Sequence, residues 1–86
     1  MKNELFAIKD VVSNAFGQPF IVGKSPQNAL AIRTFEAMMK TNPYYPDHAD
    51  DFHLYRIGTY EDTTAEVDRN IEFVISASQF TVGKEQ

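Results

Sequence analysis

The chain has no cysteine, and this absence removes several kinds of chemistry. None of its 86 residues can form a disulfide, a thiolate nucleophile, a cysteine zinc site or an iron–sulfur cluster. The sequence also lacks a run of about 18 apolar residues, so it predicts no membrane-spanning helix. We expect no signal peptide at the N-terminus, because the first residues lead directly into a strand-like segment. These features together predict a protein of a reducing cytoplasm.

The patterns that usually accompany catalysis are missing as well. The four glycines are all separated, so no glycine-rich loop is available to cradle a phosphate. No serine–histidine–aspartate order with a nucleophile elbow is present. Glu61 and Asp62 are adjacent carboxylates, but they fall in an expected turn where they should face water. We therefore expect neither an enzyme nor a cofactor.

An excess of positive charge is also lacking. Eight basic and twelve acidic residues give a net charge of -4, and the imbalance is uneven: residues 1–43 carry +2, and residues 44–86 carry -6. Proteins that coat nucleic acid through charge alone are usually basic. The composition therefore argues against such coating by an isolated monomer, although folding or association could gather the N-terminal cations on one face. The simpler interpretation is that acidity keeps a small protein soluble.

The composition, 43% hydrophobic and 13% aromatic, fits one small α+β domain over residues 1–86. The alternation of apolar and polar residues predicts strands at 5–12, 19–22, 52–60, 65–67 and 71–76, with a break at 68–70. Residues 13–17 have turn chemistry, residues 42–51 form a loop, and residues 83–86 form a frayed tail. The expected fold is a single antiparallel sheet with one helix packed on it, in the order β-β-α-β-β-β.

The helix is expected from Pro26 to about Lys40 or Thr41. Ser25 can cap its first turn, and Pro26 suits the first helical position, where no amide donor is required. Asn42-Pro43 ends it, because the residue before a proline avoids the α region. The apolar stripe that should pack against the sheet comprises Ala31, Phe35 and Met38, widened by Ile32 and Met39.

Residues 52–60 form the longest expected strand, and both of its faces carry large side chains. Alternation places on one face Phe52, Leu54, Arg56, Gly58 and Tyr60, and on the other His53, Tyr55, Ile57 and Thr59. We expect a central strand, with the helix on one side and a partner subunit on the other. A chain this small without disulfides is also only marginally stable alone, so we expect a homo-oligomer, with a dimer favoured.

Possible metal ligands are concentrated in residues 47–53. His48, Asp50, Asp51 and His53 could contact a divalent ion, but their spacing matches neither HExxH nor an EF-hand loop. An acidic, solvated segment leading into a strand explains the same residues. We therefore predict no metal site.

Binding of single-stranded nucleic acid requires aromatic platforms together with cations. The aromatic candidates are Phe16, Phe20, Tyr44, Tyr45, Tyr55 and Tyr60. The candidate binding residues are Lys9, Lys24, Arg33, Lys40, Tyr44, Tyr45 and Arg56. The structural alternative is that Phe20 and Tyr55 belong to the core and that Tyr44-Tyr45 pins the loop onto the helix.

Three stretches, in this order and spacing, resemble one family. They are Pro19-Phe20, Ala31-Ile32-Arg33-x-Phe35, and His48-x-x-Asp51-Phe52-x-Leu54-Tyr55-x-Ile57-Gly58-x-Tyr60-Glu61-Asp62. The pattern is similar to the small nonstructural protein of gokushovirus-type Microviridae, which are single-stranded DNA phages. The similarity covers residues 4–64 and fades beyond Thr64, where family members are often proline-rich.

The resemblance implies a phage accessory protein that acts in the host cytoplasm and is not part of the virion. It implies binding of single-stranded DNA during genome replication or packaging. The residues leave a second hypothesis open, an adaptor whose acidic C-terminal half docks a phage replication or capsid protein without touching DNA. A metal-dependent enzyme or small hydrolase is the third and least supported hypothesis. Cations gathered on one face would favour DNA, whereas scattered cations would favour the adaptor.

Overall fold

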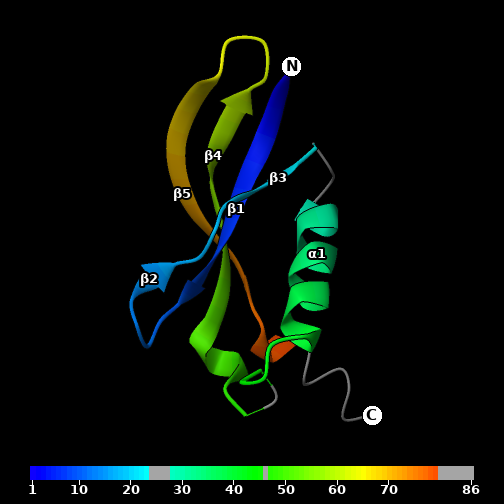
Figure 1. The fold of residues 1–86 in the computed structure, drawn as a ribbon, viewed down its shortest axis with the longest axis vertical. Helices are drawn as coiled ribbons and strands as arrows, with labels where there is room; N and C mark the ends of the chain where they lie inside the picture. The colour runs from blue at the N-terminus through cyan, green and yellow to red at the C-terminus, as the bar shows by residue number, and fades with distance from the viewer. Residues whose placement is uncertain (24–27, 46, 80–86) are drawn as a thin grey trace.

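The computed structural model describes residues 1–23, 28–45 and 47–79. It contains one antiparallel sheet with one α-helix on one side (Figure 1). The strands are β1 (Lys2–Asp10), β2 (Ala15–Phe16), β3 (Phe20–Val22), β4 (Phe52–Glu61) and β5 (Glu66–Ser76). The helix is α1 (Ala29–Lys40), and a 3-10 turn, η2 (Ala49–Asp51), precedes β4. The predicted α+β class, a single antiparallel sheet with one helix, is confirmed.

The sheet has the strand order β2-β1-β4-β5. β3 pairs with β1 along the same edge as β2, opposite residues 4–6. β4 therefore lies between β1 and β5, as expected of a strand with two bulky faces. The β4–β5 hairpin extends well past the N-terminal end of α1 (Figure 1). β5 forms one edge of the sheet over its whole length.

The element order differs from the expectation at two places. The predicted strands at 65–67 and 71–76 are one continuous strand, so Asp68-Arg69-Asn70 does not interrupt the sheet. The polar residues 68–70 are tolerated within the strand because this part of β5 is exposed to solvent on both faces. A short strand, β2, also forms within the predicted turn at 13–17. The observed order is therefore β-β-β-α-β-β.

The first strand is displaced toward the N-terminus. It was expected at 5–12, but β1 runs from Lys2 to Asp10. The Asp10 carboxylate accepts hydrogen bonds from the backbone amides of Val12, at 2.9 Å, and Ser13, at 3.4 Å. This Asx-type turn ends the strand and leaves Val11 and Val12 exposed.

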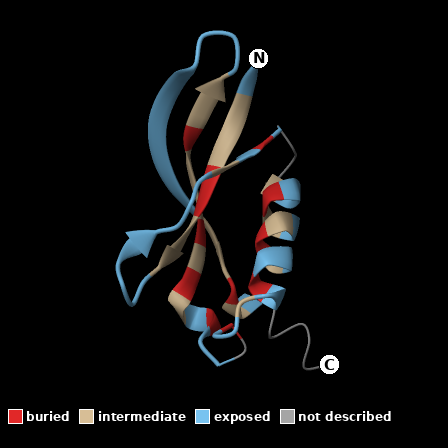
Figure 2. Ribbon diagram, viewed as in Figure 1, coloured by how far each residue is buried: buried red, intermediate tan, exposed pale blue. Residues whose placement is uncertain are grey.

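The core lies between α1 and the face of the sheet that carries Phe6 and Leu54 (Figure 2). From the helix it receives Ala31, Phe35 and Met39. Met38, predicted to belong to this stripe, is 40% exposed. The centre of the apolar stripe therefore passes through Met39, which was predicted at its margin. The predicted cap at Ser25, the first helical position at Pro26 and the frayed tail at 83–86 lie outside the described residues.

We call the opposite side of the sheet the outer face. Strand alternation places Lys9, Tyr55 and Phe73 on it, each one residue away from a neighbour that faces the helix. The alternation of β4 is interrupted by a bulge at Ile57-Gly58, where the register with both neighbouring strands shifts. Gly58 has φ of 154°, and because it lacks a Cβ atom the backbone of β5 can approach it closely.

Candidate nucleic-acid interface

A row of aromatic rings crosses the outer face from β2 to β5. The rings of Phe16 and Tyr55 are 5.4 Å apart, those of Tyr55 and Phe73 are 5.7 Å apart, and those of Phe73 and His53 are 5.4 Å apart. All three pairs meet edge to face. The antiparallel pairing of β1 with β2 and β4, and of β4 with β5, brings these four side chains together. Phe16 and Phe73 remain 44% and 56% exposed.

Two cations flank this row. Lys9 Nζ lies 5.5 Å from the centre of the Phe16 ring and 6.0 Å from that of Tyr55. Arg69 lies on the outer face because it pairs with Gly58, which in turn pairs with Leu5. Both residues line an open hollow of about 590 Å³ on this face, together with Phe16 and Tyr55. Aromatic surface and positive charge therefore occur at one place.

Carboxylates are absent from the outer face of the three long strands. The registers place every acidic residue of β1, β4 and β5 on the face that carries the helix; these are Glu4, Asp10, Glu61, Glu66, Asp68 and Glu72. On the outer side the same strands carry two charged residues, Lys9 and Arg69. A chain of net charge -4 thus presents a locally positive, aromatic sheet surface.

The other predicted cations do not join this surface. Arg56 lies on the helix-bearing face, where its guanidinium contacts Glu4 and Glu72, the latter at 3.0 Å. Two carboxylates therefore neutralise it, and its predicted role in nucleic-acid binding is not supported by its position. Arg33 and Lys40 are exposed on α1, on the other side of the sheet. Lys24 lies outside the described residues. Of the predicted cations in the described part, Lys9 alone borders the aromatic row. These predicted cations are therefore scattered, which is the arrangement expected of the adaptor, and a DNA surface has to rest on Lys9 together with Arg69.

The two tyrosines predicted as stacking platforms, Tyr44 and Tyr45, differ in their exposure to solvent. Tyr45 is 6% exposed and belongs to the hydrophobic core, so its ring is not available for stacking. Burial raises the pKa of its phenol, and the negative charge of Glu36 adds to this shift. Tyr44 is 65% exposed and meets His48 edge to face in the loop that follows α1. The alternative interpretation, in which the pair pins the loop onto the helix, holds for Tyr45.

Three residues of the outer face were missing from the predicted set: His53, Arg69 and Phe73. Phe73 falls in the strand predicted at 71–76, to which no site residue was assigned, and Arg69 falls in the predicted strand break. The available signal was alternation across the whole of residues 66–73, which puts Val67, Arg69, Ile71 and Phe73 on one side. Phe16 and Tyr55 had been candidates for aromatic platforms, and both lie in the row.

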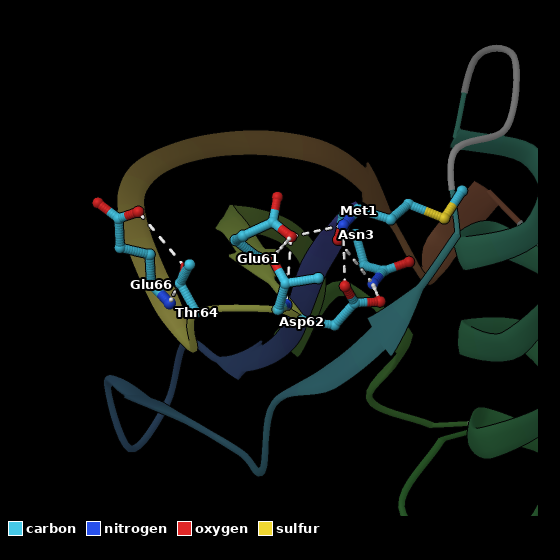
Figure 3. A network of polar contacts seen from close by, with 7 residues as sticks. Met1, Asn3, Glu61, Asp62, Thr64 and Glu66 are labelled. Carbon is cyan, nitrogen blue, oxygen red and sulfur yellow. Dashed lines mark hydrogen bonds and ion pairs between the residues drawn. The ribbon is translucent and has the colours of Figure 1, made fainter.

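A cluster of polar contacts, separate from the aromatic row, occupies the end of the β4–β5 hairpin (Figure 3). The Met1 ammonium contacts the carboxylates of Glu61 and of Asp62, the latter at 2.8 Å. Hydrogen bonds from this ammonium and from Thr63 lower the pKa of Glu61 to about 2. The hydrogen bond to Asp62, which has the larger effect, and the one to Glu61 raise the pKa of the Met1 amine. The cluster fastens the start of β1 to the hairpin.

The residues that the structure describes form no group of three or more histidine, aspartate or glutamate side chains arranged to hold a metal ion. His48 Nδ1 lies 3.5 Å from Asp51, and His53 Nε2 lies 3.1 Å from the carbonyl oxygen of Asp50. Within the same described part, no helix has the length and apolar character needed to cross a bilayer.

Comparison with known proteins places the chain among phage proteins. Neither the comparison with curated proteins nor that with solved structures gave a significant match. A family described as "Phage ORF5 protein" matches residues 3–80, which covers the helix and, apart from Lys2, all five strands. This agrees with the resemblance to a phage protein, and at this coarser level that prediction is confirmed. The chain belongs to the Phage ORF5 protein family.

Proposed function

We propose that this phage accessory protein binds single-stranded DNA on the outer face of its sheet, in genome replication or packaging. The observation that carries the proposal is the coincidence of the Phe16–Tyr55–Phe73 row with Lys9 and Arg69 on a face where β1, β4 and β5 carry no carboxylate. Exposed rings on a sheet offer stacking surfaces to unpaired bases, and cations beside them contact the backbone. Binding is stoichiometric, without turnover, metal or cofactor. The host cytoplasm is the proposed place of action, outside the virion.

The low number of cations decides which nucleic acid is favoured. Two phosphate contacts contribute a slope of only about -1.4 in log affinity against log salt for a single strand. Most of the affinity must then come from stacking, at roughly 1–3 kcal/mol per base. Bases of a duplex are already stacked and do not reach the rings. The surface therefore favours single strands over double strands.

A direct test is fluorescence anisotropy of labelled single- and double-stranded oligonucleotides, from low to physiological salt. Phe73→Leu keeps an apolar side chain on an exposed strand but removes a stacking ring, so single-strand affinity should fall about fivefold or more. Tyr44→Leu is the matched control, because Tyr44 is also exposed, at 65% against 56% for Phe73, but lies in the loop that follows α1. Absence of single-strand binding at low salt, or equal loss in both variants, would refute the assignment.

A second candidate function rests on the acidic end of the β4–β5 hairpin. Glu61, Asp62, Glu66 and Asp68 lie close together there, and all except Glu61 are exposed. This end could dock a basic segment of a phage replication or capsid protein, as an adaptor without DNA contact. If the oligonucleotides do not bind, pull-down of purified phage replication and capsid proteins with Glu66→Gln and Asp68→Asn variants becomes the deciding measurement.

A further inference from the structure

The exposed edge of the sheet is long and is only partly protected against pairing with another strand. β5 spans eleven residues, ends the strand order, and contains neither proline nor lysine. It does carry four charged residues, Glu66, Asp68, Arg69 and Glu72, and its register with β4 shifts twice. Its residues 66–73 are all exposed, including Val67 at 60%, Ile71 at 39% and Phe73 at 56%. The opposite edge is made of the short strands β2 and β3, with Pro19 between them. Free edges of this length are templates for another strand, and their charges oppose pairing most where like charges come to lie directly opposite each other.

We propose that β5 pairs antiparallel with β5 of a second copy of this chain, about a two-fold axis at Ile71. The dimer would then contain one continuous sheet in which both outer faces lie on the same side. A two-fold axis perpendicular to the sheet pairs each residue with a partner residue whose side chain lies on the same side of the sheet. Where the side chains alternate regularly, the two residue numbers of each pair therefore add up to an even number. The pairs are then Ile71 with the partner's Ile71, and Arg69 with the partner's Phe73.

Charge selects this register over its neighbours. Centring the axis on Asn70 would place Asp68 opposite the partner's Glu72, and centring it on Glu72 would place two copies of Glu72 opposite each other. Like charges directly opposite on adjacent strands are destabilising. With the axis at Ile71, no like charges face each other. Asn70 lies opposite the partner's Glu72, so that its side-chain amide can donate a hydrogen bond to the carboxylate. Arg69 meets an aromatic ring, which favours a cation above its face.

The pairing makes each outer face part of a larger surface. Arg69 of one copy lies beside Phe73 of the partner, so each aromatic row gains a cation from across the axis. The two rows lie on the same side of one sheet, about 13 Å apart at their Phe73 residues with Ile71 of both copies between them, and the number of flanking cations doubles to four. This inference concerns association of the chain with itself and does not depend on DNA being the ligand.

Single cysteines test the register directly, since the chain has none of its own. Directly opposite residues of antiparallel strands have Cα atoms about 4.5–5.5 Å apart, within the range that a disulfide spans. Ile71→Cys should therefore convert most of the protein to a covalent dimer on mild oxidation. Val67→Cys is the matched control: it lies on the same face and edge, but in this register it is about 26 Å from its own copy. It should stay monomeric on a non-reducing gel.

Sedimentation equilibrium of the unmodified chain, without DNA, supplies the second measurement. The mass should approach twice that of the monomer as concentration rises, and Ile71→Lys should return it to the monomer through repulsion at the axis. Val12→Lys, an exposed apolar residue away from β5, should not. A monomer at all concentrations, or equal cross-linking of both cysteine variants, overturns the pairing. Neither result bears on the outer face as a DNA surface, which the anisotropy experiment tests separately.

Discussion

Gly58 of β4 lies so close to β5 that a Cβ atom at this position would come within 1.9 Å of the carbonyl oxygen of Asp68. Its φ of 154° is also a value that residues with side chains rarely adopt. Gly58→Ala therefore has to displace the β5 backbone, and we expect a loss of roughly 1–3 kcal/mol or more in unfolding free energy. Urea denaturation followed by circular dichroism measures it.

Gly23→Ala provides the control for that substitution. No atom outside its chain neighbours lies within 4 Å of a Cβ built at Gly23, so its effect should stay within about 0.5 kcal/mol. Equal stability of Gly58→Ala and the unmodified protein would contradict the bulge. The bulge also shifts the alternation of β4, so the prediction that Gly58 and Tyr60 share the face of Phe52 was wrong, and both lie on the outer face with Tyr55.

The general fold followed from local patterns, whereas the element boundaries did not. The alternation in residues 52–60 predicted a central strand, and the core positions of Phe35 and Phe52 were confirmed. The strand break expected at 68–70 was wrong, because three polar residues in a row resemble a turn when the pairing partner is unknown. A long-range register with β4, not the local sequence, keeps this segment extended.

The candidate site was the least accessible to sequence reasoning. Lys9 and Arg56 look equivalent as isolated basic residues in strands, but alternation places them on opposite faces. Only pairing with Glu72 and proximity to Glu4 show that Arg56 is neutralised. Tyr44 and Tyr45 are likewise adjacent and alike, yet one is exposed and the other buried. Such differences depend on three-dimensional packing that no adjacent residue reveals.

The outer-face cations should control the salt dependence of single-strand binding. Lys9→Gln and Arg69→Gln should each weaken binding and reduce the slope of log affinity against log salt by about 0.7, because each removes one phosphate contact. Arg33→Gln and Lys40→Gln remove the same charge from the exposed side of α1 and should leave the slope unchanged. A slope that changes equally in all four variants would indicate diffuse electrostatic attraction without a defined face.

The Met1–Glu61 contact predicts a pH dependence of stability with two limits. The folded state lowers the pKa of Glu61 from 4.5 to about 2, so the carboxylate stabilises the fold above about pH 4.5, and this contribution is lost as the pH falls toward 2. The folded state raises the pKa of the Met1 amine above 8.0, so its contribution is complete below pH 8 and is lost as the pH rises through the folded value.

Thermal unfolding of the unmodified chain and of Glu61→Gln, from pH 2 to pH 10, checks this. The difference in Tm between the two should be largest between about pH 5 and pH 8 and should shrink toward either end. Glu66→Gln is the control, because Glu66 neighbours the cluster in space without contacting the Met1 amine. A difference that stays constant across the whole range would show that the ammonium–carboxylate contact does not form in solution.

Two adjacent methionines of α1 test how the helix packs on the sheet. Met39 is 3% exposed within the core, whereas Met38 is 40% exposed. Truncation of a buried methionine costs about 2–5 kcal/mol through lost burial and an unfilled cavity. Met39→Ala should therefore lower the unfolding free energy by this amount, and Met38→Ala should change it by less than about 1 kcal/mol. Chemical denaturation of both variants gives the comparison. If Met38→Ala were the more destabilising, the helix would have to be rotated so that its sequence-predicted stripe faced the sheet.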